Sequence, residues 1–261
     1  MTRITDAFAN AKNKKIFIPF ITAGDPDLET TEKLIYAMAE AGAGLIEIGI
    51  PFSDPTAEGP VIMAADTRAL EKGCKIYQIF DMLKRVRQHT QIPMVFLTYV
   101  NPIFTYGKDK FFRQCQEVQM DGVIVPDVPY DEKDTIAPEA EKYGIEIISM
   151  IAPTSHQRIQ MIAKEAQGYI YLVSSLGVTG VRKEITTDLR TIVAKIREVT
   201  DRPVAVGFGI STPEQAKNMA ALSDGAIVGS AIVKLCAQYG RDCVGPVKDY
   251  VKAMAAAVAE A

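Results

Sequence analysis

Glu47 stands inside an apolar stretch, Leu45-Ile46-Glu47-Ile48-Gly49, whose composition is typical of a buried strand. A carboxylate is costly to bury there unless it is paired or takes part in a reaction. Apolar surroundings raise the pKa of a carboxyl group toward the range in which it can both give and take a proton. We therefore predict a general acid and base at Glu47, with an ion pair inside the sheet as the alternative.

Glu58 is a second acid that follows on the same part of the chain. It lies in Pro51-Phe-Ser-Asp-Pro-Thr-Ala-Glu-Gly-Pro60, a segment too rich in proline and glycine to be helical. Because this loop follows the strand of Glu47, the two carboxyl groups can face each other across a ligand. Taken alone, however, Glu58 is better interpreted as a solvated loop charge.

Three glycine-containing turns follow other apolar runs and suggest a phosphate site. They are Gly177-Val-Thr-Gly180, Val206-Gly-Phe-Gly-Ile-Ser211 and Val228-Gly-Ser-Ala231. Glycine lets backbone N–H groups approach phosphate oxygens, and a helix beginning at Ser230 would add the positive end of its dipole. One such turn can be a simple tight corner, but three at neighbouring strand ends favour phosphate binding.

The remaining candidate pocket residues are mostly apolar and fall at the ends of further runs. They are Phe20, Thr22, Leu97, Tyr99 and Tyr171. Each ring can equally be core packing, but with two acids and a phosphate anchor the set indicates an aromatic or hydrophobic phosphate ester. Asp127 lies between prolines in Val125-Pro-Asp-Val-Pro129, a stiff loop that is either catalytic or a docking element.

The elements that must position these residues are eight short apolar runs. They cover residues 16–21, 45–48, 94–98, 123–125, 145–149, 169–173, 203–206 and 226–228. The runs are continuous rather than alternating, which is typical of parallel strands buried on both faces. Helical patterns lie between them, for example at 30–41, 75–88 and 189–199, and another closes the chain at 248–260.

This alternation predicts an α/β fold, a single (β/α)₈ barrel domain over residues 1–261. An open doubly wound sheet is the alternative; the count of eight and the lack of a proline- and serine-rich linker favour the barrel. A helical stretch at 4–11 precedes the first strand and can plug the N-terminal mouth. Long loops are expected after the second and sixth strands, and those at the carboxyl ends of barrel strands build active sites.

Composition excludes several other classes of protein. The 29 Lys+Arg and 32 Asp+Glu residues give a net charge of −3, which argues against nucleic-acid binding. No apolar run is long enough to span a membrane, and the polar start is unlike a secretory signal. The four cysteines form no CxxC pair and there are two histidines, so we expect no metal site and four reduced thiols in a cytoplasmic protein.

Several stretches together resemble the tryptophan synthase alpha chain family along essentially the whole chain. They are Pro19-Phe-Ile-Thr-Ala-Gly-Asp-Pro26, Leu45-Ile-Glu-Ile-Gly-Ile-Pro-Phe-Ser-Asp-Pro55, Gly59-Pro-Val-Ile62, Pro126-Asp-Val-Pro129, Gly177-Val-Thr-Gly180 and Gly207-Phe-Gly-Ile-Ser211. The resemblance implies a barrel that cleaves indole-3-glycerol phosphate to indole and glyceraldehyde 3-phosphate. It makes Glu47 the proton shuttle and places Glu58 at the second acid, which holds the indole N–H.

The resemblance also assigns the other candidates. Phosphate contacts carry over to Gly180, Gly209, Gly229 and Ser230, pocket positions to Phe20, Leu97, Tyr99 and Tyr171, and the mobile loop after the sixth strand to Thr179. The implied partner is a beta chain that carries pyridoxal phosphate, in an αββα complex that passes indole internally. Asp54, Asp127 and Pro129 match its interface loops, and we expect no cofactor bound to this chain.

The sequence departs from the family on the loop that carries the second acid. The family pattern Ala-Asp-Gly-Pro is Ala57-Glu58-Gly59-Pro60 here, Thr56 stands at a usual leucine and Met63 at a common glutamine. Glutamate is one methylene longer than aspartate, and a misplacement of about 1 Å can cost on the order of a hundredfold in rate. We therefore expect a working but slower lyase.

Three other interpretations stay open at this point. A mainly regulatory subunit would bind the phosphate ligand and activate the beta chain while cleaving little itself. A stand-alone indole-producing lyase would need no partner. Another phosphate-binding barrel, such as an isomerase of histidine synthesis, is disfavoured by the Glu47-Ile-Gly-Ile-Pro-Phe-Ser-Asp54 stretch.

Overall fold

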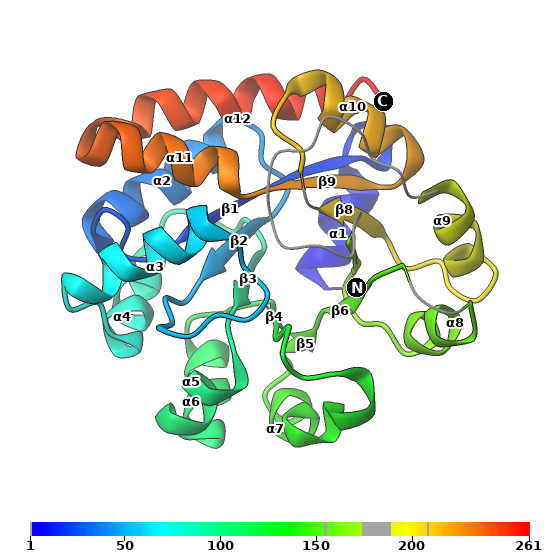
Figure 1. The fold of residues 1–261 in the computed structure, drawn as a ribbon, viewed down its shortest axis with the longest axis horizontal. Helices are drawn as coiled ribbons and strands as arrows, with labels where there is room; N and C mark the ends of the chain where they lie inside the picture. The colour runs from blue at the N-terminus through cyan, green and yellow to red at the C-terminus, as the bar shows by residue number, and fades with distance from the viewer. Residues whose placement is uncertain (1, 154–155, 174–188, 208) are drawn as a thin grey trace.

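The computed structural model describes residues 2–153, 156–173, 189–207 and 209–261, and its strands and helices alternate along the chain (Figure 1). The strands are β1 Ile16–Thr22, β2 Ile46–Gly49, β3 Met94–Leu97, β4 Gly122–Ile124, β5 Glu146–Ile147, β6 Ser149–Ile151, β7 Ile170–Val173, β8 Val204–Gly207 and β9 Gly225–Val228. The α-helices are α1 Arg3–Asn10, α2 Leu28–Glu40, α3 Pro60–Glu71, α4 Ile76–Val86, α5 Val100–Tyr106, α6 Lys108–Glu117, α7 Ala137–Lys142, α8 His156–Lys164, α9 Leu189–Arg197, α10 Pro213–Leu222, α11 Ser230–Tyr239 and α12 Val244–Val258. Short 3₁₀ helices span Lys12–Lys14, Tyr130–Thr135 and Gly240–Cys243.

The strands form one parallel sheet that comes round on itself as a barrel. Their order is β5-β4-β3-β2-β1-β9-β8-β7-β6, and every pair is parallel. The two ends of this order, β5 and β6, are separated in the chain by Ile148 alone, whose N–H donates to the Val123 carbonyl at 2.9 Å. The predicted (β/α)₈ barrel is therefore confirmed, and the open sheet is excluded.

The fifth predicted strand, 145–149, is the element whose description needs correction. It consists of two short strands, because β5 pairs with β4 and β6 pairs with β7, and the pairing partner changes at Ile148. Residues of β5 are half-buried, whereas β2, β7, β8 and β9 are buried throughout. β5 and β6 are thus the least buried strands of the barrel.

Helix α1 closes the N-terminal end of the barrel, as predicted. Its Ile4 and Phe8 are buried among inward-facing strand residues such as Ile18 and Leu45. The Phe8 ring lies 6.0 Å, centroid to centroid, from the ring of Tyr169. Thr2 caps the helix and its hydroxyl donates to Glu146 at 3.1 Å.

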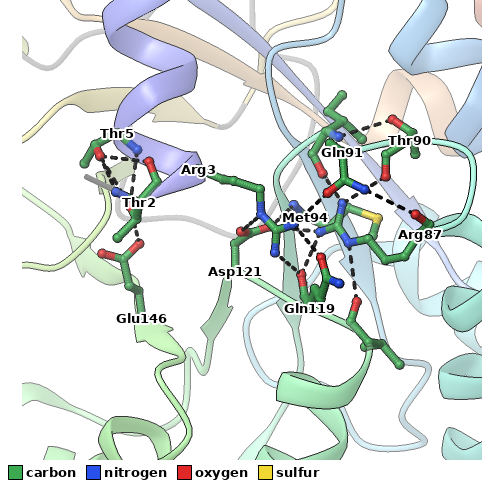
Figure 2. A network of polar contacts seen from close by, with 12 residues as sticks. Thr2, Arg3, Thr5, Arg87, Thr90, Gln91, Met94, Gln119, Asp121 and Glu146 are labelled. Carbon is green, nitrogen blue, oxygen red and sulfur yellow. Dashed lines mark hydrogen bonds and ion pairs between the residues drawn. The ribbon is translucent and has the colours of Figure 1, made fainter.

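A polar network fixes this same end of the barrel (Figure 2). Asp121 accepts hydrogen bonds from Arg3 Nε at 2.7 Å, from Arg87 Nη2 at 2.9 Å and from the Met94 N–H at 2.9 Å. Burial lowers the pKa of Arg87 to about 10, although the facing Asp121 carboxylate opposes this. The network joins α1 to the starts of β3 and β4, so the N-terminal face is structural and the opposite face is left for ligands.

The predicted long loop after β2 is present and runs from Ile50 to Gly59, where α3 begins with Pro60 at its first turn. The long loop predicted after the sixth strand follows β7 and lies outside the described residues. All four cysteines are buried and free of disulfide bonds. Among the described residues, no helix has the length and apolar character needed to cross a membrane.

Candidate active site

Glu47 points into the barrel from β2, where it is paired in register with Phe20 and Val95 and is 1% exposed. The Tyr169 hydroxyl donates a hydrogen bond of 2.6 Å to Glu47 Oε1. Burial raises the pKa of Glu47 to about 8, and the tyrosine hydrogen bond opposes the rise. The side chain that hydrogen-bonds to Glu47 is the neutral phenol of Tyr169, and no ion pair of Glu47 is found among the described residues.

Tyr169 is a site residue that the sequence analysis missed. It is fully buried immediately before β7, two positions from the predicted Tyr171. Residues two apart on a strand share a face, so an inward Tyr171 already implied an inward Tyr169. Tyr171 in turn needs Gly207, because a Cβ at that position would lie 2.3 Å from the Tyr171 hydroxyl oxygen.

Glu58 is not a solvated loop charge, and that interpretation is wrong. Its Oε2 atom is buried and has no hydrogen-bond partner among the described residues. Burial raises the pKa of Glu58, while interactions with Asp66 and the Tyr99 hydroxyl lower it. The Tyr99 oxygen also accepts from the Ala57 N–H at 3.1 Å, which fixes the loop beside Glu58.

Asp66 on α3 is a second residue that the sequence analysis missed. It is 4% exposed and faces Glu58. Burial and the nearby charge of Glu58 raise the pKa of Asp66 well above the ordinary value for an aspartate. A signal was present in the sequence, because Asp66 interrupts the helical apolar face made by Ile62, Ala65 and Ala69.

Helix α3 is held firmly over the end of β1. Arg68 on the helix forms a two-pronged ion pair with the buried Asp25, with Nε–Oδ1 at 2.9 Å and Nη2–Oδ2 at 2.7 Å. Lys72 adds a hydrogen bond of 2.8 Å to the Pro26 carbonyl. Paired arginine–carboxylate hydrogen bonds fix orientation as well as distance, so Asp66 is presented from a rigid element.

Most of the predicted site residues line one pocket at the carboxyl ends of the strands. They are Phe20, Glu47, Glu58, Leu97, Tyr171, Gly209, Gly229 and Ser230. Further lining residues that were not predicted are Ala57, Ile62, Pro126, Met150, Ile210, Ile227 and Ala231. The two acids therefore share one pocket with the glycine turns that follow β8 and β9.

The other predicted pocket residues are placed differently. Tyr99 lies behind Glu58 and does not line the described pocket. Thr22 is buried at the end of β1, away from the lining, and its Oγ1 has no hydrogen-bond partner in the described part of the chain. Thr179 and Gly180 lie outside the described residues.

The glycine turns after β8 and β9 form one side of the pocket. Gly229 is the N-cap of α11, and Gly229, Ser230 and Ala231 all line the pocket. The predicted helix start at Ser230 is thus confirmed, and its positive dipole end faces the cavity. Gly209 has a φ of 77°, a backbone conformation that glycine adopts without strain.

The three predicted interface residues lie on loops around this pocket without lining it. Asp54 and Pro129 are exposed on the loops after β2 and β4. Asp127 is half-buried and accepts from the Val100 N–H at 3.1 Å, which anchors the start of α5. Asp127 therefore has a structural contact in addition to any docking role.

The pocket combines a buried carboxyl group, a second acid and a helix N-terminus. The model of the tryptophan synthase alpha chain family matches residues 7–259. This chain belongs to the tryptophan synthase alpha chain family. Family membership makes it a carbon–carbon lyase and confirms the resemblance drawn from the sequence motifs.

Individual relatives support the same family over nearly the whole chain. The tryptophan synthase alpha chain of Lacticaseibacillus casei is 49% identical over 258 residues, covering 99% of this chain and 96% of the relative. Tryptophan synthase subunit alpha from Legionella pneumophila is 33% identical, with a TM-score of 0.88 and 100% of both chains covered. A chain of the tryptophan synthase a2b2 complex from Pyrococcus furiosus is 34% identical, with a TM-score of 0.82 over 92% of this chain and 97% of that one.

Proposed function

We propose that this chain cleaves indole-3-glycerol phosphate to indole and glyceraldehyde 3-phosphate, with Glu47 moving the proton and Glu58 binding the ring nitrogen. The observation that carries the proposal is a buried carboxyl group, whose pKa is raised to about 8, in the same pocket as a second acid. Phe20, Leu97 and Tyr171 supply apolar walls for an aromatic ring.

The proposed reaction is a retro-aldol cleavage. The protonated carboxyl group of Glu47 gives its proton to C3 of the indole ring, and the ring nitrogen becomes positively charged. The resulting Glu47 carboxylate takes the proton of the hydroxyl group on the adjacent side-chain carbon. The bond from C3 to that carbon breaks, its electron pair returns to the ring, and the aldehyde forms. Glu47 ends protonated as it began, and a pKa of about 8 suits both transfers.

Glu58 is proposed to hold the indole N–H during this step. The buried, unpartnered Oε2 of Glu58 is an acceptor that a ring N–H would satisfy. A negative carboxylate also stabilises the positive charge that develops on the ring nitrogen. The N-terminus of α11 at Gly229 and Ser230 is proposed to bind the phosphate group.

The proposal includes a protein partner, a beta chain that uses pyridoxal phosphate to join indole to serine. The Pyrococcus furiosus relative belongs to an a2b2 complex. Asp54, Asp127 and Pro129 lie on loops at the pocket end of the barrel, where a partner could receive indole directly. The cofactor is proposed to belong to the partner, with none bound to this chain.

Indole release from indole-3-glycerol phosphate, measured with and without a purified beta chain, tests the proposal. We expect turnover by the native chain, stimulation by the partner, and a loss of at least about a hundredfold in Glu47→Gln, since general acid–base catalysis contributes roughly that much. Glu71→Gln, at an exposed position on α3, is the matched control. Native turnover by Glu47→Gln would refute the assigned role, and absent turnover with an accelerated beta reaction would support a regulatory subunit.

The finer proposal is that Glu58 slows the lyase relative to an aspartate. Glu58→Asp shortens the side chain by one methylene, and we expect faster indole formation, by as much as about a hundredfold if the present misplacement is about 1 Å. Single-turnover rates separate this chemical effect from substrate binding. An unchanged or lower rate would mean that the site is built around glutamate.

A further inference from the structure

Two carboxyl groups interact directly, that of Glu58 on the loop after β2 and that of Asp66 on α3. Two carboxylates in contact repel each other, so one of the pair holds a proton while the other carries the charge. Which of them keeps the proton decides whether the pocket offers a charged acceptor to a ligand.

The surroundings of each group place the proton on Asp66. Asp66 is 4% exposed and lies near Asp25, whereas Glu58 is half-buried and lines the pocket, so a negative charge is better solvated on Glu58. The Tyr99 hydroxyl interacts with Glu58 and favours its charged form. A backbone hydrogen bond from Phe52 favours the charged form of Asp66 but is outweighed by burial and by Glu58.

The structure assigns Asp66 as a positioning residue for the proposed reaction: its neutral carboxyl group donates a hydrogen bond to the Glu58 carboxylate and leaves Glu58 Oε2 for the substrate N–H. This inference rests on the proposed function, in which Glu58 binds the ring nitrogen. It agrees with the unpartnered state of Oε2, because Asp66 and Tyr99 interact with the Glu58 carboxyl group while Oε2 has no hydrogen-bond partner among the described residues.

Asp66 can fix Glu58 because it is itself fixed. It projects from α3, and the Arg68–Asp25 ion pair ties that helix to the end of β1. Glu58 lies on a loop and has one more rotatable bond than aspartate, so an unrestrained Glu58 would sample several rotamers. The Asp66 carboxyl group on this rigid helix restricts the Glu58 side chain to one position, in which Oε2 can accept from the substrate N–H.

The test separates the hydrogen bond from simple packing with two variants of Asp66. Asp66→Asn keeps a side-chain donor of nearly the same size, and Asp66→Leu keeps the volume without a donor. We expect Asp66→Asn to retain most of the indole-forming activity and Asp66→Leu to lower kcat by about tenfold to a hundredfold, the usual range for losing a hydrogen bond to a charged group. Thermal unfolding of both variants checks whether they fold, and Asp81→Leu at an exposed position on α4 is the matched control.

The pH dependence gives a readout that a packing role would not change. The charged and titratable groups around the pair are Asp25 and Arg68 beside Asp66, Tyr99 beside Glu58, and Cys236 of α11 beside Arg68. Glu47 and Asp66 are both needed in protonated form, so the logarithm of kcat/KM in the native chain should fall at alkaline pH with a slope approaching −2. In Asp66→Asn the slope should stay at −1.

Two results would overturn the inference: native kcat in Asp66→Leu, or a slope of −2 in Asp66→Asn. A measurement on the resting protein keeps this test separate from the proposed function. In a carboxyl-labelled sample, the NMR titration of Asp66 should be centred above neutral pH and should move to lower pH in Glu58→Gln, which removes the neighbouring charge. An Asp66 that is ionised at neutral pH would refute the pairing even if the chain cleaves its substrate as proposed.

Discussion

Replacing Glu47 by glutamine should stabilise the fold while it removes activity. The pKa of Glu47 is raised from 4.5 to about 8, so the folded state binds the proton more tightly than the unfolded chain does. The ionisation of Glu47 therefore leaves the free energy of unfolding unchanged below pH 4.5 and lowers it as the pH rises from 4.5 to 8. Above that range its contribution is constant. Glutamine is neutral throughout and still accepts from Tyr169, so it avoids this loss.

The size of the effect follows from the two pKa values. The shift from 4.5 to about 8, at roughly 1.4 kcal/mol per unit, corresponds to a destabilisation of about 5 kcal/mol at high pH. With the same two values, the advantage of Glu47→Gln should be about 1 kcal/mol at pH 5 and about 3 kcal/mol at pH 7. The other titrating acids are common to both proteins and cancel in the difference.

Urea unfolding of the native chain and Glu47→Gln between pH 5 and pH 9.5 measures this difference directly. Glu71→Gln, which alters an exposed acid on α3, should show no trend with pH. The reasoning is refuted if Glu47→Gln is less stable than the native chain at every pH, or if the difference does not grow between pH 5 and pH 8. Either result would mean that Glu47 is not a buried acid with a raised pKa.

Two further changes act on the same group of side chains. Tyr169→Phe removes the hydrogen-bond donor that lowers the pKa of Glu47. The alkaline limit of indole formation should therefore move upward by about one pH unit, as expected for losing a hydrogen bond to a carboxylate. An unchanged or lower limit in the pH–rate profile would contradict this. Gly207→Ala places a Cβ 2.3 Å from the Tyr171 hydroxyl oxygen, so the ring must move and kcat/KM should fall by about tenfold or more. Gly245→Ala, where a Cβ meets no atom within 4 Å, is its control, and equal rates in the two variants would show that Tyr171 is not held by Gly207.

The barrel could be predicted because its strands are buried on both faces and are therefore apolar without interruption. The same property made Glu47 conspicuous, since a charge inside such a run has few structural explanations. The fifth strand was located, but its division at Ile148 depends on which neighbour each half pairs with, and a single sequence does not contain that information.

Glu58 shows where sequence reasoning was insufficient. A glutamate in a loop rich in proline and glycine is usually solvated. Glu58 is buried here because it contacts Asp66 of α3 and Tyr99, and the loop sequence alone does not show these contacts. Asp66 and Tyr169 could have been found from the sequence. Asp66 is an acid on an apolar helical face, and Tyr169 lies two residues from the inward-facing Tyr171. The roles of Thr179 and Gly180 stay predictions.

Helix α1 closes the N-terminal end of the barrel and leaves the opposite end for access to the pocket. Ile4 and Phe8 close the N-terminal end of the barrel, and Tyr169 and Glu47 fill the interior next to them. In the described parts of the chain, a molecule in the pocket therefore enters and leaves at the carboxyl-terminal ends of the strands. Admission of substrate and escape of a small neutral product then depend on the same opening. A protein seated on the loops of Asp54 and Pro129 would govern both, and could collect what leaves without any tunnel through the barrel itself.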